Sequence, residues 1–183
     1  MQFDTTSEWG TWAPKGVAKF ALDTIRSLPV NPICKRLAFL LRKPVKKGRQ
    51  PFYDVSLWGY RLRLSAKGNL SEQRWLTMPQ FHDAEERELI ASKLSGGGVF
   101  FDIGANAGFY TFWVLSRQRK DVSLYAVEPC RLMQERLRYN LSLNALEESL
   151  CLIECAVTAQ PCEVHIQEHA DNLGQTSISE SGQ

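Results

Sequence analysis

A seven-residue turn between two apolar segments constrains the fold of this chain more than any other feature. Residues 102–108 read Asp-Ile-Gly-Ala-Asn-Ala-Gly, and residues 99–103 form an apolar run of strand length with one acid near its end. Residues 107–115 have the composition of a helix, and residues 123–127 resemble a second buried strand that is followed by Glu128. This order predicts a β-turn-α-β unit that binds a nucleotide at the turn.

The spacing within the turn indicates which nucleotide fits. A dinucleotide site uses Gly-x-Gly-x-x-Gly, whereas this turn reads Asp-x-Gly-x-Asn-x-Gly, with Asn106 where the second Gly could fall. Asn accepts left-handed backbone angles but obstructs the closest approach of a phosphate. S-adenosylmethionine, which carries no phosphate, is the favoured ligand, and Glu128 can accept hydrogen bonds from both ribose hydroxyls. A nicotinamide-binding Rossmann domain is the alternative cofactor reading.

The charge of the chain is unevenly distributed. The formal net charge is only +2, yet residues 14–50 contain ten Lys and Arg against a single Asp, a net charge of +9 that leaves about −7 for the rest. A solvated helix face is one interpretation of this region, and contact with an anionic membrane surface is another. Trp12, Phe20 and Phe39 do not form a base-stacking array, so no nucleic acid is expected.

Cysteine and histidine patterns indicate neither disulfides nor a metal. The five Cys residues include no Cys-x-x-Cys pair, and Cys151 and Cys155 are interpreted as neighbours on one face of a buried strand. His165 lies in an alternating segment that should point it to solvent, so we predict no metal site with His169. No apolar run approaches the roughly 18 residues of a membrane span, and no signal peptide is recognised.

The pattern along the chain predicts four regions. Residues 1–50 form a basic N-terminal extension with a loosely held start, two short helices and a basic linker at 43–51. Residues 51–98 form a hairpin around Trp58-Gly59 and a helix that begins with a capping box at Asp83. Residues 99–178 form a Rossmann-like half-domain with a further helix at 131–143 and strands at 150–155 and 163–167. Residues 179–183 form a tail, and the chain should fray from residue 177.

Several segments together resemble the FkbM-type S-adenosylmethionine-dependent methyltransferases. The segments are 101–111, 126–129, 136–144 and 172–174, with Gly-Asn-Leu-Ser-Glu at 68–72 and the helix entry at Phe81 upstream. The resemblance covers roughly residues 52–178. It implies a Rossmann-like class I methyltransferase fold in the α/β class and O-methylation of a hydroxyl on a sugar, glycolipid or secondary metabolite.

The resemblance also implies a cofactor site but no catalytic residue. Asp102, Gly104, Asn106 and Gly108 would line the methionine side, Glu128 would hold the ribose, and Cys155 or Ala156 after the third strand would lie near the adenine. Pro129-Cys130 replaces the usual Pro-Asn of the family. The implied cofactor-binding residues are Asp102, Gly104, Ala105, Asn106, Gly108, Phe109, Glu128, Pro129, Cys155 and Ala156.

The resemblance stops before the family's later strands and its substrate face. We therefore expect a fold that is incomplete at the C-terminus, with an uncovered apolar sheet edge and face, and either an enzyme or a truncated, inactive fragment. The expected partners are a small-molecule or glycan hydroxyl substrate and an anionic membrane surface through residues 14–50. The expected location is cytoplasmic, peripheral at the inner membrane face.

Overall fold

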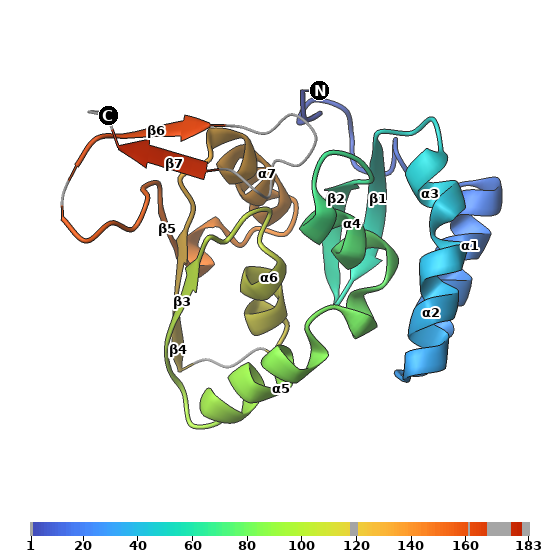
Figure 1. Ribbon diagram of the computed structural model, residues 1–183, viewed down its shortest axis with the longest axis horizontal. Coiled ribbons are helices and arrows are strands. Elements are labelled where there is room, and N and C mark those ends of the chain that lie inside the picture. Colours follow the sequence, from blue (N-terminus) through green and yellow to red (C-terminus); the bar gives the residue numbers. More distant parts are fainter. Residues whose placement is uncertain (1, 118–120, 161, 168–176, 181–183) are drawn as a thin grey trace.

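The computed structural model describes residues 2–117, 121–160, 162–167 and 177–180 (Figure 1). Its elements in chain order are α1 (Gly16–Ser27), α2 (Pro32–Leu41), α3 (Lys43–Lys47), β1 (Phe52–Leu57), β2 (Tyr60–Ser65), α4 (Leu70–Thr77), η1 (Pro79–Phe81), α5 (Ala84–Lys93), β3 (Gly98–Ile103), α6 (Phe109–Ser116), β4 (Val122–Val127), α7 (Arg131–Ser142), η2 (Glu147–Ser149), β5 (Cys151–Ile153), β6 (Val164–Gln167) and β7 (Ser177–Glu180).

The elements follow one another in layers across the long axis of the molecule. The β3–β4–β5 sheet stands toward one end, α6 and α7 lie beside it, the β1–β2 hairpin with α4 comes next, and α1 to α3 form the opposite end (Figure 1). One hydrophobic cluster joins buried side chains of α1, the hairpin, α4, α6 and α7. The predicted α/β class is confirmed.

The predicted Rossmann-like unit is a parallel three-stranded sheet. Its order is β3-β4-β5, with Ile103 opposite Val127 and Tyr125 opposite Cys151. The third strand is shorter than predicted, so Cys151 and Cys155 do not share a buried strand face, and both are exposed.

One face of this sheet is bare. Val99, Phe101 and Ile103 alternate along β3 and are 53% to 64% exposed, whereas Phe100 packs toward α6. Within the described chain, α6 and α7 lie on the same side of the sheet (Figure 1). The expected uncovered apolar face is confirmed, because successive side chains of a strand point to opposite faces and only one face has helices against it.

The hairpin forms where the sequence predicts it. β1 and β2 pair antiparallel with Leu57 opposite Tyr60, and the two turn residues Trp58 and Gly59 have φ of 54° and 89°. Positive φ at both central residues is the geometry of the two-residue turns that match strand twist. Gly59 adopts this conformation without strain, as expected.

Two asparagine side chains of α7 and its C-terminal end complete the outer edge of β2. The Asn140 amide accepts from Arg63 N at 2.7 Å and donates to Arg63 O at 3.3 Å. The Asn144 amide makes the same pair of hydrogen bonds with the backbone of Arg61, both at 2.8 Å. An amide side chain thus substitutes for a neighbouring strand and leaves no unpaired edge at these positions.

The first residues of the chain are docked, which corrects the expectation of a loosely held start. Phe3 is buried, and the guanidinium of buried Arg63 donates to the carbonyls of Asp4, Ser7 and Glu8. Arg63 also forms a bidentate pair with Asp54, whose Oδ2 accepts from the backbone of Gly10 and Trp12. This buried ion pair, together with its hydrogen bonds to the backbone of residues 4–12, holds the first segment in place.

Other local expectations are corrected in detail. Residues 43–47 form the short helix α3 rather than a linker. Residues 177–180 pair with β6 as an antiparallel strand instead of fraying. Residues 181–183 and His169 lie outside the described residues, and His165 is exposed as predicted.

Candidate functional site

The turn after β3 carries three residues with left-handed backbone conformation. Gly104, Asn106 and Gly108 have φ of 77°, 53° and 95°. The amides of Gly104 and Ala105 both donate to Val127 O, at 2.8 and 3.0 Å, which ties the turn to the end of β4. The turn is therefore a fixed structure at the carboxyl edge of the sheet, where open α/β folds bind ligands.

The two glycines of the turn serve different purposes. A Cβ on Gly108 would lie 2.5 Å from Leu137 Cδ1 and 3.3 Å from the ring of Phe112, so Gly108 permits close packing of α6 against α7. A Cβ on Gly104 would meet no atom within 4 Å. Gly104 faces open space beside a fixed backbone, and such a position lets a ligand approach the backbone closely.

Glu128 holds the turn from the end of the neighbouring strand. Its Oε2 accepts from Asn106 N at 2.7 Å, and its Oε1 accepts from Cys130 N at 2.8 Å. Burial raises the pKa of this carboxyl, while the two backbone hydrogen bonds oppose the rise. Each oxygen retains a second lone pair, so Glu128 can clamp the loop and still accept a hydrogen bond from a ligand.

Asp102 is turned toward the helix that follows the loop. Its Oδ2 accepts from the backbone N and the hydroxyl of Thr111, at 2.9 and 2.6 Å. Burial raises the pKa of Asp102, the Thr111 hydrogen bonds lower it, and the nearby charge of Glu128 raises it further. Asp102 thus orients the first turn of α6, and contact with a methionine ammonium stays a prediction.

Asn106 connects the loop to a segment far away in the sequence. Its Oδ1 accepts from Asn69 Nδ2 at 2.6 Å and from Ala107 N at 2.7 Å. Asn69 is fully buried and also accepts from Glu72 N at the start of α4. The sequence pattern at 69–72 resembles a capping box and could have predicted this cap, but not the contact with Asn106.

A polar cluster that sequence reasoning missed lies against the start of α6. The ring of His82 is buried with its centroid 4.2 Å from that of Phe109, and His82 Nδ1 lies 3.1 Å from Asp83 Oδ1. On the other side, His82 Nε2 lies 3.4 Å from the hydroxyl of half-buried Ser71. Tyr110 Oη donates to Asp83 Oδ2 at 3.0 Å.

The environment of His82 favours its neutral form. Burial lowers the pKa of His82, and the adjacent Asp83 carboxylate opposes this, while Arg74 and Arg87 reinforce it. Asp83 has φ of 46° and makes no cap hydrogen bond, which corrects its predicted role in a capping box. The carboxylate instead accepts from His82 Nδ1 and from Tyr110, so Nε2 is left as an acceptor toward Ser71.

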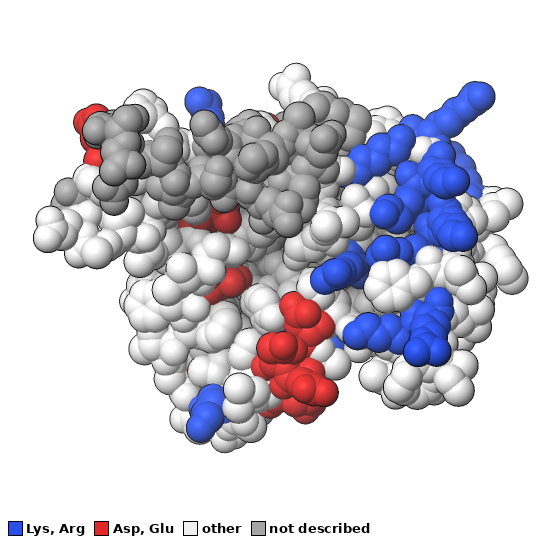
Figure 2. Space-filling model, in the orientation of Figure 1, with Lys and Arg blue, Asp and Glu red and all other residues white. Residues whose placement is uncertain are grey.

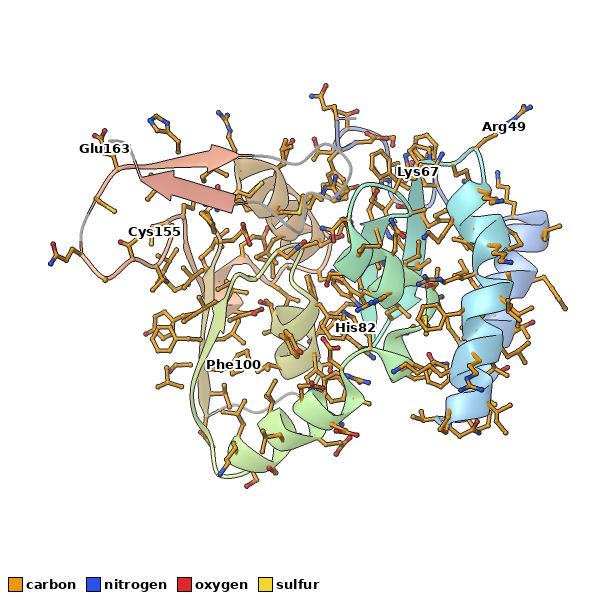
Figure 3. The ribbon with its side chains drawn as sticks, in the orientation of Figure 1. Arg49, Lys67, His82, Phe100, Cys155 and Glu163 are labelled. Atoms are coloured by element: carbon orange, nitrogen blue, oxygen red, sulfur yellow. The ribbon has the colours of Figure 1, made fainter. Side chains whose placement is uncertain are left out.

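Cys155 and Ala156, the two residues expected near the adenine, share one hollow with Pro129. Pro129, Cys155 and Ala156 line a depression of about 240 Å³ beside β6. Figure 3 shows Cys155 near the β6–β7 pair and His82 between the helices on the opposite side of the sheet. The hollow and the His82 cluster therefore lie on different sides of the sheet.

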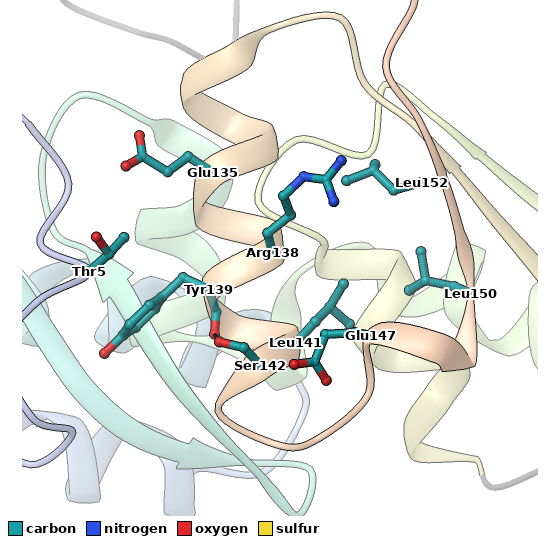
Figure 4. A pocket seen from close by; sticks show the side chains of 9 residues that line it. All are labelled: Thr5, Glu135, Arg138, Tyr139, Leu141, Ser142, Glu147, Leu150 and Leu152. Atoms are coloured by element: carbon teal, nitrogen blue, oxygen red, sulfur yellow. Dashed lines mark hydrogen bonds between the residues drawn. The ribbon is translucent and has the colours of Figure 1, made fainter.

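A wider hollow of about 470 Å³ on the outer side of α7 contains none of the predicted residues (Figure 4). It is lined by Thr5, Glu135, Arg138, Tyr139, Leu141, Ser142, Glu147, Leu150 and Leu152. Arg138 beside it is exposed and pairs with Glu154. Size alone does not identify the site here, because this hollow lacks the glycine backbone and buried acids found at the carboxyl edge of β3.

The described residues hold no cluster of three or more Cys, His, Asp or Glu side chains arranged for a metal ion. None of the described helices is long and apolar enough to span a bilayer. Among the described residues no disulfide joins any of the five cysteines, which are Cys34, Cys130, Cys151, Cys155 and Cys162.

Neither a family model nor a curated protein matches this sequence. Solved structures show a partial likeness of fold. A candidate S-adenosyl-L-methionine-dependent methyltransferase of Methanococcus maripaludis is 21% identical with a TM-score of 0.35, over 43% of this chain and 36% of its own. A complex of aTrm5 with tRNALeu is 23% identical with a TM-score of 0.45, over 63% and 31%. The tRNA m1G37 methyltransferase of M. jannaschii is 23% identical with a TM-score of 0.41, over 60% and 31%.

The chain spans about a third of the length of each of these structures, and the likeness concerns the fold alone. It corrects one expectation. Two of the three structures are a tRNA methyltransferase and a protein bound to tRNA, which contradicts the expectation that excluded nucleic acid. That expectation was drawn from missing aromatic side chains in the N-terminal region, which say nothing about a partner bound elsewhere.

Proposed function

We propose that this chain binds S-adenosylmethionine at the carboxyl edge of β3 and β4 and is part of a methyltransferase. The observation that carries this proposal is Gly104, which has φ of 77° and faces open space in the loop that Glu128 holds through Asn106 N. If the loop needed glycine only for close packing, other atoms would occupy the space next to both glycines, as they do at Gly108. The open position fits a ligand that touches the backbone.

Each part of the site has an expected role toward the cofactor. Glu128 would accept from the ribose hydroxyls with its free lone pairs, and Pro129, Cys155 and Ala156 would face the adenine in their hollow. Asp102 and Asn106 would hold the loop so that Gly104, Ala105 and Phe109 meet the methionine part. When bound, S-adenosylmethionine supplies a methyl group on a sulfonium, which is transferred to a nucleophile.

We further propose a hydroxyl as the methyl acceptor, in line with the FkbM-type resemblance. Support comes from the Asn69–Asn106 hydrogen bond, which joins two of the segments that carry the resemblance, and from the His82 cluster. The acceptor hydroxyl would give its proton to the Ser71 oxygen, while the Ser71 hydroxyl proton would pass to His82 Nε2, 3.4 Å away. Because burial lowers the pKa of His82, its imidazole is neutral and Nε2 has a lone pair that can accept a proton.

Calorimetric titration of the full chain with S-adenosylmethionine tests the cofactor site. Glu128→Ala should weaken binding by about 1.5–3 kcal/mol, the usual loss for charge-assisted hydrogen bonds. Gly104→Val should abolish binding. Gly59→Val is the matched control, because Gly59 also has positive φ and open space but lies in the hairpin turn.

If Gly104→Val and Gly59→Val bind alike, the ligand lies elsewhere. Titration with NAD distinguishes the alternative cofactor, and binding of NAD in place of S-adenosylmethionine would overturn the proposal. Release of S-adenosylhomocysteine with sugar, glycolipid and tRNA acceptors then identifies the acceptor class. A chain that binds S-adenosylmethionine but shows no turnover would support the inactive alternative.

A further inference from the structure

The surface of α1 and α2 exposes an unusual set of apolar side chains. Along α2, Ile33, Leu37 and Leu40 are 79%, 42% and 59% exposed. Their spacing of four and three residues puts them on one face of the helix. On α1, Val17 and Phe20 are 68% and 71% exposed. The buried residues of α1 are Ala21, Leu22 and Ile25.

The opposite faces of these helices are firmly attached to the protein. Arg26 donates to Leu76 O at 2.7 Å, and Gln80 Nε2 donates to Ile25 O at 2.6 Å. Ala38 of α2 is fully buried against a small core that includes Met78 and Phe81. The exposed apolar residues of α1 and α2, called the apolar stripe below, therefore lie on helices whose other faces are packed against the protein.

Cations surround the stripe. Six exposed basic residues of this region form no ion pair within the described chain, namely Lys15, Lys35, Arg36, Lys43, Lys47 and Arg49. Figure 2 shows blue side chains gathered over α1 to α3, while the red ones gather over α5. Exposed aliphatic side chains among unpaired cations fit an anionic lipid surface, which takes up the former and attracts the latter.

We propose that the α1–α2 surface is a docking site for an anionic phospholipid bilayer, which goes beyond the proposed methyl transfer. Lipid is favoured over RNA because the exposed side chains between the cations are mainly aliphatic, and aliphatic side chains offer no stacking faces, so that Phe20 is left as an isolated exposed ring. The ring of Phe39, one of the two aromatic residues, is already covered by the Arg42 guanidinium at 4.3 Å. The bare face of β3 carries no such cations, so it does not share this chemistry.

Co-sedimentation of the full chain with vesicles tests the proposal. The chain should pellet with phosphatidylcholine vesicles that contain phosphatidylglycerol, pellet much less at high salt, and ignore pure phosphatidylcholine. Lys35→Glu with Arg36→Glu should reduce partitioning about tenfold or more, given about 1 kcal/mol for each basic residue near such a surface. The double variant Ile33→Ser with Leu37→Ser should lose a comparable share of its partitioning, and it should still not bind neutral lipid.

Lys93→Glu and Leu89→Ser are the matched controls, because both residues are exposed on α5 outside the surface. Circular dichroism confirms that each variant is folded. Equal loss in controls and test variants overturns the proposal, as does equal pelleting with both lipids. Binding of bulk tRNA with no vesicle binding would make the surface a nucleic-acid site. If the chain forms a dimer and the double variant Ile33→Ser with Leu37→Ser dissociates that dimer, the α1–α2 surface is instead a contact between copies of this chain.

Discussion

The β1–β2 hairpin and the β3–β4–β5 sheet reverse the burial that their types predict. A parallel sheet is normally covered on both faces, and an isolated two-stranded hairpin is marginal in water. In this protein the hairpin is buried along almost its whole length, while alternate residues of β3 face solvent. The difference teaches that burial follows from what packs around a strand, because the hairpin is enclosed by the N-terminal segment, α4 and α7.

The two regions also use polar groups differently. Around the hairpin, buried Arg63 and Asp54 join the N-terminal segment to both strands, and Arg136 of α7 pairs with buried Glu72 of α4. At the parallel sheet, the buried acids Asp102 and Glu128 have no basic partner among the described residues and accept mainly backbone N–H groups. The first arrangement holds elements together, and the second leaves carboxylates available at an edge.

Replacing the centre of the hairpin region should have the largest effect. Arg63→Ala leaves Asp54 buried without its partner and frees residues 2–12, so the free energy of unfolding should fall by about 3–5 kcal/mol. Urea unfolding followed by tryptophan fluorescence measures this. Arg61→Ala is the control, because Arg61 lies on the same strand but is exposed. A similar loss for both variants would mean that the buried ion pair does not hold the region.

Packing at the loop should give the next largest effect. Gly108→Ala would place a methyl group 2.5 Å from Leu137 Cδ1 and force a positive φ on a residue with a Cβ. Overpacking of this kind typically costs about 1–3 kcal/mol, so thermal unfolding should occur at a lower temperature. Gly104→Ala has only the conformational strain and should cost less. A larger loss at Gly104 would contradict the division of roles between the two glycines.

The pH dependence of stability should report the buried acid of β3. Because the folded-state pKa of Asp102 is raised, the folded protein binds the proton more tightly than the unfolded chain does. The contribution of Asp102 to the unfolding free energy should therefore fall as pH rises from about 4 through the raised pKa. Asp102→Asn should remove this slope, because an amide side chain does not titrate. The amide oxygen can still accept from Thr111, so the hydrogen bonds are kept.

Urea unfolding of both proteins across this pH range measures the slope as their difference. Taking the difference cancels the other titrating groups that the two proteins share. A wild-type advantage that grows with pH would show that the hydrogen bonds from Thr111 outweigh burial and lower the pKa.

The bare sheet face should give the smallest effect on stability and a clear effect on association. Phe101 stacks on Tyr125 with a centroid distance of 4.8 Å but is about half exposed, so Phe101→Ser should change stability by only about 0.5 kcal/mol. The variant should associate less at high concentration, because an exposed apolar strand at a sheet edge favours self-pairing. Sedimentation velocity compares Phe101→Ser with Leu89→Ser, which is the control. Equal association of the two variants would show that the exposed face of β3 does not mediate association.

The sequence alone predicted most of the local structure of both regions, although β5 is shorter than expected. The hairpin turn, the parallel unit around residues 102–108 and the helices at 16–27, 32–41 and 131–142 follow from periodicity and from glycine positions, which are local properties. The placement of Glu128 at the loop also followed, because parallel strands end at the same edge.

Only the tertiary structure decided which side chains meet. The Asn69–Asn106 hydrogen bond and the Arg63 network join residues tens of positions apart, and no local pattern encodes such contacts. The His82 cluster was missed because its members Ser71, His82, Asp83 and Tyr110 come from three segments. Likewise, amphipathic periodicity marks an apolar stripe on α1 and α2 but not whether it faces core or solvent. That depends on how neighbouring elements share the available surface, which the whole fold sets.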